Sequence, residues 1–362
     1  MKRYFLFLTI ISFLLLSCSK TNRGELLEIP IDIDKNIPLT LSEITEELTS
    51  IDLELIDESI INPMSIRNVF LLENELFIVT MYRILVFNKE GKYLNSIGSM
   101  GQGPGEYNYI KDCALDKKNR RLFITTYNKK VMSYDFNGNL LVETIELPFE
   151  YSDLNYINDE LLLLVRKFVQ TNKGTYSRSE LLHLNDALQI TDSCTLADLY
   201  FEKIPGGGYS HRYSDFIIKG SKYTQVYYGD FYNRYHGEER FLCDTLYRFE
   251  KRKFIPELKL KFKNDGVFKF IKICNIYRSS RYVFTVFFNY SRRDFYISCY
   301  DTKTEKGYIV QDGFIDDINQ ISPARIRPFK LDSEIYYYLH TNMKPDDLEE
   351  PNPTLYIGKL KK

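Results

Sequence analysis

Short runs of alternating apolar and polar residues recur along the chain, and each of the clearest runs ends in a turn. The run Ile84-Leu-Val-Phe-Asn-Lys-Glu-Gly91 returns 47 residues later as Val131-Met-Ser-Tyr-Asp-Phe-Asn-Gly138. An alternating strand that leads into a Gly-containing turn is typical of a β-hairpin. Weaker copies of the run begin at Leu181, Leu246, Ile297 and Leu355.

A second apolar run lies upstream of each of these six runs. The upstream runs are Leu76–Val79, Leu122–Thr125, Leu161–Leu164, Tyr223–Tyr228, Tyr282–Val286 and Glu334–Leu339. Six pairs of runs at a spacing of roughly 50 residues leave room for four strands in each copy. The pattern predicts an all-β fold, a six-bladed β-propeller over residues 40–362. Two stacked β-domains joined near residues 197–215 are the alternative, although no Pro- or Ser-rich linker separates the halves.

The two ends of the predicted propeller fit together. Few residues follow the run at Leu355, so the sixth blade lacks its outer strand. The segment from Leu48 to Asp57 alternates cleanly and has no blade of its own. We expect it to pair beside Leu355–Leu360, which would close the ring and remove an exposed strand edge.

The N-terminus carries an export signal. Met1-Lys2-Arg3 is basic, and Tyr4–Leu16 is an apolar run too short to span about 30 Å of hydrocarbon. The run ends in Leu15-Leu16-Ser17-Cys18, which resembles the bacterial lipoprotein processing site, where the Cys is acylated. An ordinary secretory signal that happens to contain a Cys is the alternative.

This address sets the expected organisation of the chain. Residues 1–17 are the signal peptide, Cys18 is the lipidation site, and residues 18–39 are a lipidated tether that leads into the propeller. We expect a protein anchored by lipid in the cell envelope, at the outer membrane. The lack of an acidic cluster after Cys18 favours the periplasmic face slightly over the cell surface.

Composition narrows the classes of partner. The chain has 48 Lys and Arg against 49 Asp and Glu, so its charge excludes a generic nucleic-acid binder. The charges are segregated, because residues 25–60 hold eleven acids while residues 248–293 hold thirteen Lys and Arg. The two regions either screen each other in a closed ring or leave a basic stripe that binds an acidic glycan or partner.

Cysteine and histidine spacing gives no sign of a metal site or a cofactor. Beyond Cys18 the cysteines are Cys113, Cys194, Cys243, Cys274 and Cys299, an odd number with no Cys-x-x-Cys spacing. The four histidines form no His-Glu-x-x-His motif. We expect these cysteines to be small apolar residues of buried strands.

Several motifs together resemble a known family. They are the processing site, Ile37-Pro-Leu39, Phe87-Asn-Lys-Glu-Gly91, Ile97-Gly-Ser-Met-Gly-Gln-Gly-Pro-Gly-Glu-Tyr107 and Asp244-Thr-Leu-Tyr-Arg248. With them the chain resembles the six-bladed β-propeller lipoproteins of bacterial envelopes, which are similar to NHL-repeat propellers. The resemblance implies a fold and an envelope address. That family has no established activity, so the resemblance implies no catalytic residue.

The glycine-rich segment Gly98–Asn108 is the first candidate site. It joins an outer strand to the next inner strand, and its four glycines permit unusual backbone angles. This position predicts that Gln102, Glu106 and Tyr107 lie near the mouth of the propeller channel, where they could bind a polar ligand. The alternative is a structural corner, in which Glu106 caps backbone amides and Tyr107 packs between blades.

Long loops on the same face form the second candidate site. The expected loops are Arg166–Ser179, Gly229–Asp244, Asn289–Asp294 and His340–Pro353, with a further connection over residues 203–213. Their candidate ligand-binding residues are His211, Arg212, Arg234, His236, Arg292 and Arg293. Guanidinium forks suit carboxylate, sulfate or phosphate groups.

Two functions from different classes follow. The favoured one is a membrane-tethered binding or interaction module, which recognises an anionic glycan or an envelope protein over the channel without a cofactor. The alternative is a propeller hydrolase or lyase that acts on a carbohydrate or a lactone. Glu106, Asp112, Asn128 and Asp153 are conceivable calcium ligands for such an enzyme, but no spacing singles them out. No Gly-x-Ser-x-Gly nucleophile elbow occurs.

Overall fold

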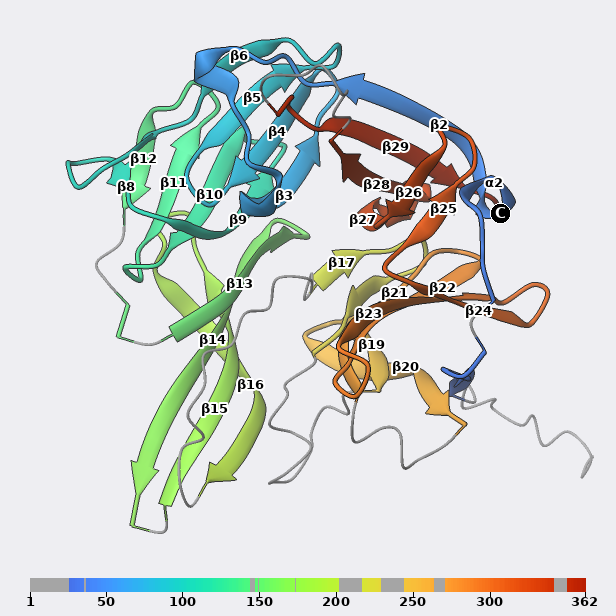
Figure 1. The fold of residues 1–362 in the computed structure, drawn as a ribbon. Coiled ribbons are helices and arrows are strands. Elements are labelled where there is room, and N and C mark those ends of the chain that lie inside the picture. The colour runs from blue at the N-terminus through green and yellow to red at the C-terminus, as the bar shows by residue number, and fades with distance from the viewer. Residues whose placement is uncertain are drawn as a thin grey trace, which may run out of the picture.

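The computed structural model describes residues 26–35, 37–143, 147–148, 150–172, 174–201, 217–228, 244–263, 271–341 and 350–362. Within these ranges, six sheets with mainly antiparallel pairing are arranged as blades around a common centre (Figure 1). The prediction of an all-β, six-bladed propeller is therefore confirmed.

Blades 1 to 3 each consist of four consecutive strands, ordered from the inner to the outer edge. Blade 1 holds β3 (Ile66–Leu71), β4 (Glu75–Thr80), β5 (Ile84–Asn88) and β6 (Tyr93–Ser96). Blade 2 holds β9 (Ile110–Asp116), β10 (Arg121–Thr126), β11 (Val131–Asp135) and β12 (Leu140–Glu143). Blade 3 holds β13 (Glu150–Ile157), β14 (Glu160–Thr171), β15 (Gly174–Leu184) and β16 (Ile190–Phe201).

Blades 4 to 6 follow the same order, and two of them include N-terminal strands. Blade 4 holds β17 (Ile217–Lys219), β18 (Thr224–Val226), β19 (Thr245–Glu250), β20 (Lys253–Phe262) and β1 (Leu27–Ile31). Blade 5 holds β21 (Ile271–Arg278), β22 (Tyr282–Asn289), β23 (Asp294–Asp301) and β24 (Lys306–Gln311). Blade 6 holds β27 (Arg327–Lys330), β28 (Ile335–His340), β29 (Thr354–Leu360) and β2 (Thr45–Asp52).

The remaining described elements are short. Two small sheets pair β7 (Ser99–Met100) with β8 (Glu106–Tyr107), and β25 (Phe314–Asp316) with β26 (Ile321–Ala324). The helical turns are α2 (Leu41–Ile44), η1 (Asp57–Ser59), η2 (Pro63–Ser65) and η4 (Leu331–Ser333). No helix of the described ranges is long and apolar enough to cross a membrane.

The repeated sequence runs are the third strands of the blades, and their turns explain why the pattern recurs. Asn88 Oδ1 accepts hydrogen bonds from the backbone N–H groups of residues 90 and 92. Asp135, Asn185 and Asp301 make the same kind of contact after β11, β15 and β23. An Asn or Asp side chain that bonds the backbone two to four residues ahead fixes a tight turn. The sequence repeat therefore reflects two needs, an alternating strand and an Asn or Asp side chain that fixes the turn after it.

One expected loop is a pair of strands. Residues 166–179 were expected as a long loop, but β14 continues to Thr171 and β15 begins at Gly174, with Arg166 opposite Ser179. The side chains of Lys167 and Glu180 form an ion pair on this extension. Polar side chains that lie along a projecting hairpin gave this segment the composition of a loop. Most of the loop expected over 229–244, and residues 342–349 of the last one, lie outside the described residues.

The predicted ring closure is confirmed. Strand β2 pairs antiparallel with β29, from Thr45 opposite Leu360 to Asp52 opposite Thr354 (Figure 1). The strand begins before Leu48 and ends before Asp57, the bounds that were expected. It ends at Asp52 because the chain there turns towards blade 1, where the N–H of Glu54 donates to the carbonyl oxygen of Gly91 (2.9 Å).

A tyrosine fastens the closing strand to blade 6. Tyr336 of β28 lies opposite Gly358 of β29, and its ring covers the glycine so closely that a Cβ there would be 2.1 Å from Cζ of Tyr336. The hydroxyl of Tyr336 reaches Oγ1 of Thr45 in β2 at 2.7 Å. Tyr336 is buried, with 1 % of its surface exposed. One side chain thus links three neighbouring strands across the point where the ring closes.

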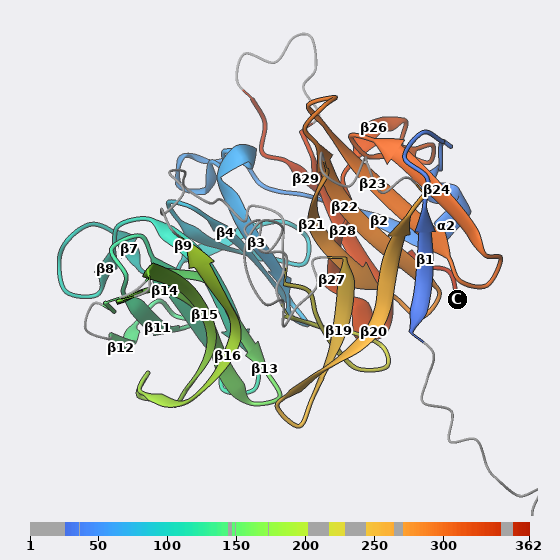
Figure 2. The same ribbon diagram turned by 90° about the horizontal axis from the view of Figure 1, so that it is seen from below.

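The segment before β2 is also part of the propeller, which the sequence reading did not anticipate. Strand β1 pairs in parallel with β20, from Leu27 opposite Leu258 to Ile31 opposite Phe262 (Figure 2). Ile37 then forms a bridge with Ile309 of β24. Residues 27–44, here termed the N-terminal strap, thus follow the outer edges of blades 4 and 5 before β2 completes blade 6.

Ion pairs between the strap and its neighbours account for the segregated charge. The pairs are Glu28–Lys261 (2.8 Å), Asp32–Lys263 (3.1 Å) and Asp34–Arg292 (3.1 Å), and β2 adds Glu46–Lys359 (3.1 Å). Exposed pairs of this kind contribute little each, about 0–1 kcal/mol. In the first three pairs the acidic residue belongs to the N-terminal segment and the basic residue to the region between residues 248 and 293. The two oppositely charged regions therefore neutralise each other here.

Candidate functional site

Two kinds of connection share one end of the ring, here termed the loop face. They are the loops between the second and third strands of a blade, such as residues 81–83, and the connections from an outer strand to the next inner strand, such as residues 97–109. The N–H of Ile110 donates to the carbonyl oxygen of Met81 (2.9 Å), and the N–H of Tyr127 donates to that of Tyr109 (3.0 Å). Neighbouring loops are thus fastened to each other by backbone hydrogen bonds.

Tyr107, a predicted site residue, lies inside the corner between blades 1 and 2. Only 2 % of its surface is exposed, and its ring meets the ring of Tyr134 edge-on at 6.2 Å. Its hydroxyl donates to the carbonyl oxygen of Ile97 (3.1 Å). Burial raises the pKa of Tyr107, so the phenol stays neutral. The side chain holds two blades together.

Glu106 fixes the glycine-rich corner from within. Its Oε2 accepts the N–H of Gly103 (2.8 Å), and a Cβ on Gly101 would lie 2.0 Å from that same oxygen. The glycine at 101 therefore leaves the room that the carboxylate occupies. Gln102, at the tip of the segment, is exposed. The contacts of Glu106 and Tyr107 are those of the structural corner that was weighed as the alternative.

Of the other predicted site residues, the structure describes only Arg292 and Arg293. Arg292 lies between β22 and β23, on the loop face of blade 5, and its Nη2 donates to Oδ1 of Asp34 in the strap (3.1 Å). Arg293 follows it in a left-handed backbone conformation (φ 57°). This pair is not brought together with the corner at Gly98–Asn108, which lies between blades 1 and 2. Cys18, His211, Arg212, Arg234 and His236 lie outside the described residues.

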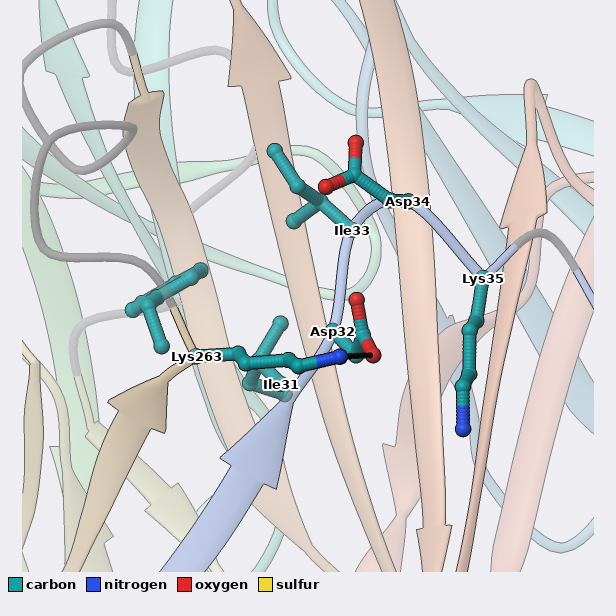
Figure 3. Close-up of a pocket in the computed structure, with 7 residues that line it drawn as sticks. Ile31, Asp32, Ile33, Asp34, Lys35 and Lys263 are labelled. Carbon is teal, nitrogen blue, oxygen red and sulfur yellow. Dashed lines mark hydrogen bonds and ion pairs between the residues drawn. The ribbon is translucent and has the colours of Figure 1, made fainter.

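A pocket of about 320 Å³ opens beside the strap, where β1 and β20 end (Figure 3). It is lined by Ile31, Asp32, Ile33, Asp34, Lys35, Phe262 and Lys263. Lys263 points to Asp32 across the pocket, and Asp34 is the partner of Arg292. Two of its carboxylates are thus already paired with basic side chains of this chain, which leaves the pocket little net charge for a ligand.

A row of exposed tyrosines lies elsewhere on the loop face. Tyr82, Tyr109 and Tyr127 have 39 %, 42 % and 53 % of their surface exposed. The ring centroids of Tyr82 and Tyr109 are 5.7 Å apart, and those of Tyr109 and Tyr127 are 6.4 Å apart, with both pairs edge-on. These three residues, termed the tyrosine row, come from two adjacent blades and from the connection between them. Large exposed aromatic groups in contact are a feature of binding surfaces.

Two basic residues border the tyrosine row. Arg67 Nη2 lies 3.0 Å from Sδ of Met81 and 3.5 Å from the hydroxyl of Tyr127, while Lys111 Nζ lies 5.9 Å from the centroid of the Tyr127 ring. Both are the extra residue of a β-bulge in an inner strand, between Ile66 and Asn68 and between Ile110 and Asp112. A bulge re-aims a side chain out of the regular pleat. Here it brings two cations to the same aromatic surface.

A polar network supports these bulges from below. Oδ1 of Asp112 accepts the amide of Asn68 (3.1 Å), with the amide oriented to donate, and Oδ2 accepts the N–H of Leu154 (2.6 Å). One carboxylate therefore connects the inner strands of blades 1, 2 and 3. Charge-assisted hydrogen bonds of this kind are strong, so the base of the tyrosine row is rigid.

The residues weighed as calcium ligands have other contacts. Asp112 is held as just described, Glu106 bonds within its corner, and Oδ1 of Asn128 accepts the hydroxyl of Thr126 (2.5 Å). Among the residues that the structure describes, no three His, Cys, Asp or Glu side chains gather closely enough to hold a metal ion.

Comparison with known proteins places the chain in a family. Residues 26–361 match the profile of the domain of unknown function DUF4934. The chain belongs to the DUF4934 family. No curated protein matches this chain.

One of the solved structures compared with this DUF4934 chain shares its fold. A Bacteroides fragilis protein whose name proposes that it is exported superposes with a TM-score of 0.64 and 19 % identity, over 92 % of this chain and 100 % of that one. The Neurospora crassa Pan2 WD40 domain gives 0.40 and 9 %, over 82 % and 76 %. The Cps50 (Swd1) β-propeller domain of Myceliophteria thermophila gives 0.43 and 10 %, over 83 % and 99 %. At such identity, the first of these shows a shared fold.

The sequence of this DUF4934 chain did carry a signal for the tyrosine row. The tripeptide Ile66-Arg67-Asn68 recurs as Ile110-Lys111-Asp112, and Tyr82 and Tyr127 occupy matching loops after Thr80 and Thr126. An alignment of blades 1 and 2 that allows the spacing to fall from 47 residues at the third strands to 44 at the inner strands would have matched these positions. The longer loops of the later blades were the expected site, whereas Tyr82 and Tyr127 lie in the short loops between β4 and β5 and between β10 and β11.

Proposed function

We propose that this protein is a binding module of the bacterial cell envelope that recognises an anionic glycan or protein partner with its loop face. The observation that carries the proposal is the tyrosine row with Arg67 and Lys111 at its border. Tyrosine rings offer flat apolar surfaces with a polar edge, which suit sugar faces. The two cations suit the carboxylate or sulfate groups of such a ligand.

A useful affinity requires several contacts at once. Hydrogen bonds to charged groups contribute roughly 1.5–3 kcal/mol each. Micromolar binding corresponds to about 8 kcal/mol, so two such bonds supply about 3–6 kcal/mol, and stacking on the rings and further contacts must supply the rest together with the cost of association. Rigid support of the bulges by Asp112 reduces that cost, because the cations are held in place before a ligand arrives.

Further contacts belong to the same proposal. Gln102 is exposed at the tip of the glycine-rich corner, and Arg292 and Arg293 lie on the loop face of blade 5. His211, Arg212, Arg234 and His236 are proposed contributors from their sequence positions. Arg292 would have to exchange its bond with Asp34 for one with the ligand, so we expect it to contribute less than Arg67.

Membrane attachment through Cys18 is the second part of the proposal. The basic start, the apolar run and the processing site support it, and the name of the Bacteroides fragilis relative supports export alone. We place the protein at the outer membrane, on the periplasmic face. In a Cys18→Ala chain, a fatty-acid label should be absent and the protein should leave the membrane fraction, whereas unchanged labelling would contradict the anchor.

Replacement of the central tyrosine tests the binding site. We expect Tyr109→Ala to weaken binding to chondroitin sulfate or polygalacturonate at least tenfold, because about 1.4 kcal/mol is lost with one stacked ring. Arg67→Gln should weaken binding as well and should reduce its dependence on salt. Isothermal titration with the mature soluble chain, with neutral dextran for comparison, measures both effects.

Leu94→Ala is the control, because Leu94 is also an exposed large apolar side chain of blade 1 but lies in the outer strand β6. It should leave the affinity within about twofold of the parent value. The proposal for the tyrosine row fails if an acidic glycan binds and Tyr109→Ala leaves its affinity unchanged.

A further inference from the structure

Three lysines mark the end of the channel opposite the loop face. Lys117 directly follows β9 in blade 2, Lys219 ends β17 in blade 4, and Lys330 ends β27 in blade 6. All three strands are the inner strands of their blades, and all three run towards this end, here termed the turn face. Because inner strands surround the channel, their ends converge at its mouth. Three alternate blades each contribute one lysine there.

Contacts across the ring show that this mouth is narrow. Lys219 Nζ of blade 4 lies 3.7 Å from Oδ2 of Asp332, which belongs to η4 in blade 6. Ile218, the residue before Lys219, packs against the core that blades 5 and 6 share. Blades 4 and 6 are not neighbours in the ring, so their side chains meet across the mouth of the channel.

Basic groups act on one another at this mouth. Burial lowers the pKa of Lys117, and the ammonium groups of Lys330 and Lys219 lower it further, while the carboxylate of Asp332 opposes them. The nearby carboxylate of Glu334 is engaged elsewhere, because both of its oxygens accept the N–H of Ser280 (2.9 and 3.1 Å). The ammonium groups of Lys117, Lys219 and Lys330 therefore act on one another at this mouth, and Asp332 is the carboxylate in contact with Lys219.

We propose that the mouth of the channel on the turn face is a binding site for a tetrahedral oxyanion, a phosphate or sulfate group, either free or carried on a sugar. Lysine ammonium groups are compact point charges with three donors each, and they suit such a group when several approach it from different sides. A dianion between Lys117, Lys219 and Lys330 removes the mutual repulsion of the three cations. This site lies at the opposite end of the channel from the tyrosine row and does not depend on the function proposed there.

Asp332 gives the site a distinctive response to substitution. Its carboxylate neutralises one of the three cations when no anion is bound, and it repels an anion that enters. Asp332→Asn should therefore tighten anion binding, whereas Lys117→Ala and Lys330→Ala should weaken it. If these residues had only a structural role, the aspartate variant would not bind the anion more tightly while the lysine variants bind it more weakly.

Titration with small anions tests the proposal on the mature soluble chain. Sodium phosphate, sodium sulfate and glucose 6-phosphate are added in turn at low ionic strength, with sodium chloride at matched ionic strength as the reference. We expect saturable binding of at least one of them by calorimetry, with about tenfold weaker affinity in Lys117→Ala and in Lys330→Ala. Asp332→Asn should bind several-fold more tightly.

Controls separate the site from general surface charge. Lys118 lies next to Lys117 in the same turn and is exposed, so Lys118→Ala removes the same charge a residue away and should change the affinity by less than about twofold. Binding of phosphate or sulfate supports a site for the free ion, and binding of glucose 6-phosphate alone supports a site for a sugar-borne group. The proposal is overturned if none of the anions acts beyond chloride, or if Lys117→Ala and Lys118→Ala behave alike.

Discussion

A mature chain shortened to begin at residue 53 is expected to lose most of its stability and its cooperative unfolding transition. The shortening removes the N-terminal strap and β2, whose buried apolar side chains include Ile29, Ile31, Leu39, Leu41 and Ile44. At about 1.5–3 kcal/mol for each buried side chain, the loss is on the order of 8–15 kcal/mol as an upper estimate. That is comparable to the whole stability of a typical domain, about 5–15 kcal/mol.

The shortened chain also leaves β29 as an open edge, which favours aggregation. Thermal unfolding followed by circular dichroism, with size-exclusion chromatography, measures both effects against a chain that begins at residue 25. A third chain that begins at residue 38 lacks β1 but keeps α2 and β2, so it should lose less. Equal melting temperatures for the chains that begin at residues 25 and 53 would contradict the role of β2 in closure.

Gly358→Ala is expected to be the most damaging single methyl addition in blade 6. The new Cβ would lie 2.1 Å from Cζ of Tyr336, whose ring is buried and whose hydroxyl is held by Thr45. Because the ring has no free space to move into, β28 and β29 must separate or the bond to Thr45 must break. Overpacking of this kind costs typically 1–3 kcal/mol or more. We expect the melting temperature to fall by roughly 2–5 °C, because the unfolding entropy of a chain this long is large.

Two variants isolate the cause. Gly307→Ala adds the same methyl group to β24, where the nearest side-chain atom is 3.6 Å away in Tyr300, so it should change stability by less than about 0.5 kcal/mol. Tyr336→Phe removes only the hydroxyl that Thr45 contacts and should cost about 1 kcal/mol. If Gly358→Ala and the parent protein have the same melting temperature, Tyr336 does not fasten the closing strand.

The fold was predictable because strand and turn requirements repeat in the sequence. Six third strands were found from alternation, and several of them end at an Asn or Asp that fixes the next turn, as Asn88 and Asp135 do. The strap was not predictable, because β1 is a single parallel strand with no hairpin partner beside it in the sequence. Its alternation over Leu27–Ile31 is too short to be separated from that of a polar tether.

The candidate site was predictable only in part. The sequence shows which side chains are present, whereas the site depends on where those side chains point. Glu106 and Tyr107 carry polar groups, yet both turn inward and use them on backbone partners. Arg67 and Lys111 belong to inner strands, and only the β-bulges bring them to the tyrosine row. Lys117, Lys219 and Lys330 lie far apart in sequence, so their convergence is a property of the ring.

The pairing of β2 with blade 6 also constrains the order in which the chain folds. Blades 1 to 3 are built from consecutive hairpins, which form quickly from local contacts. Closure instead joins residues as distant as Ser42 and Lys361, a separation of 319 residues, and must wait for the last strand. A chain that is stalled or cleaved before Thr354 therefore carries two unsatisfied edges at once, on β2 and on β28, and either edge can pair with another copy.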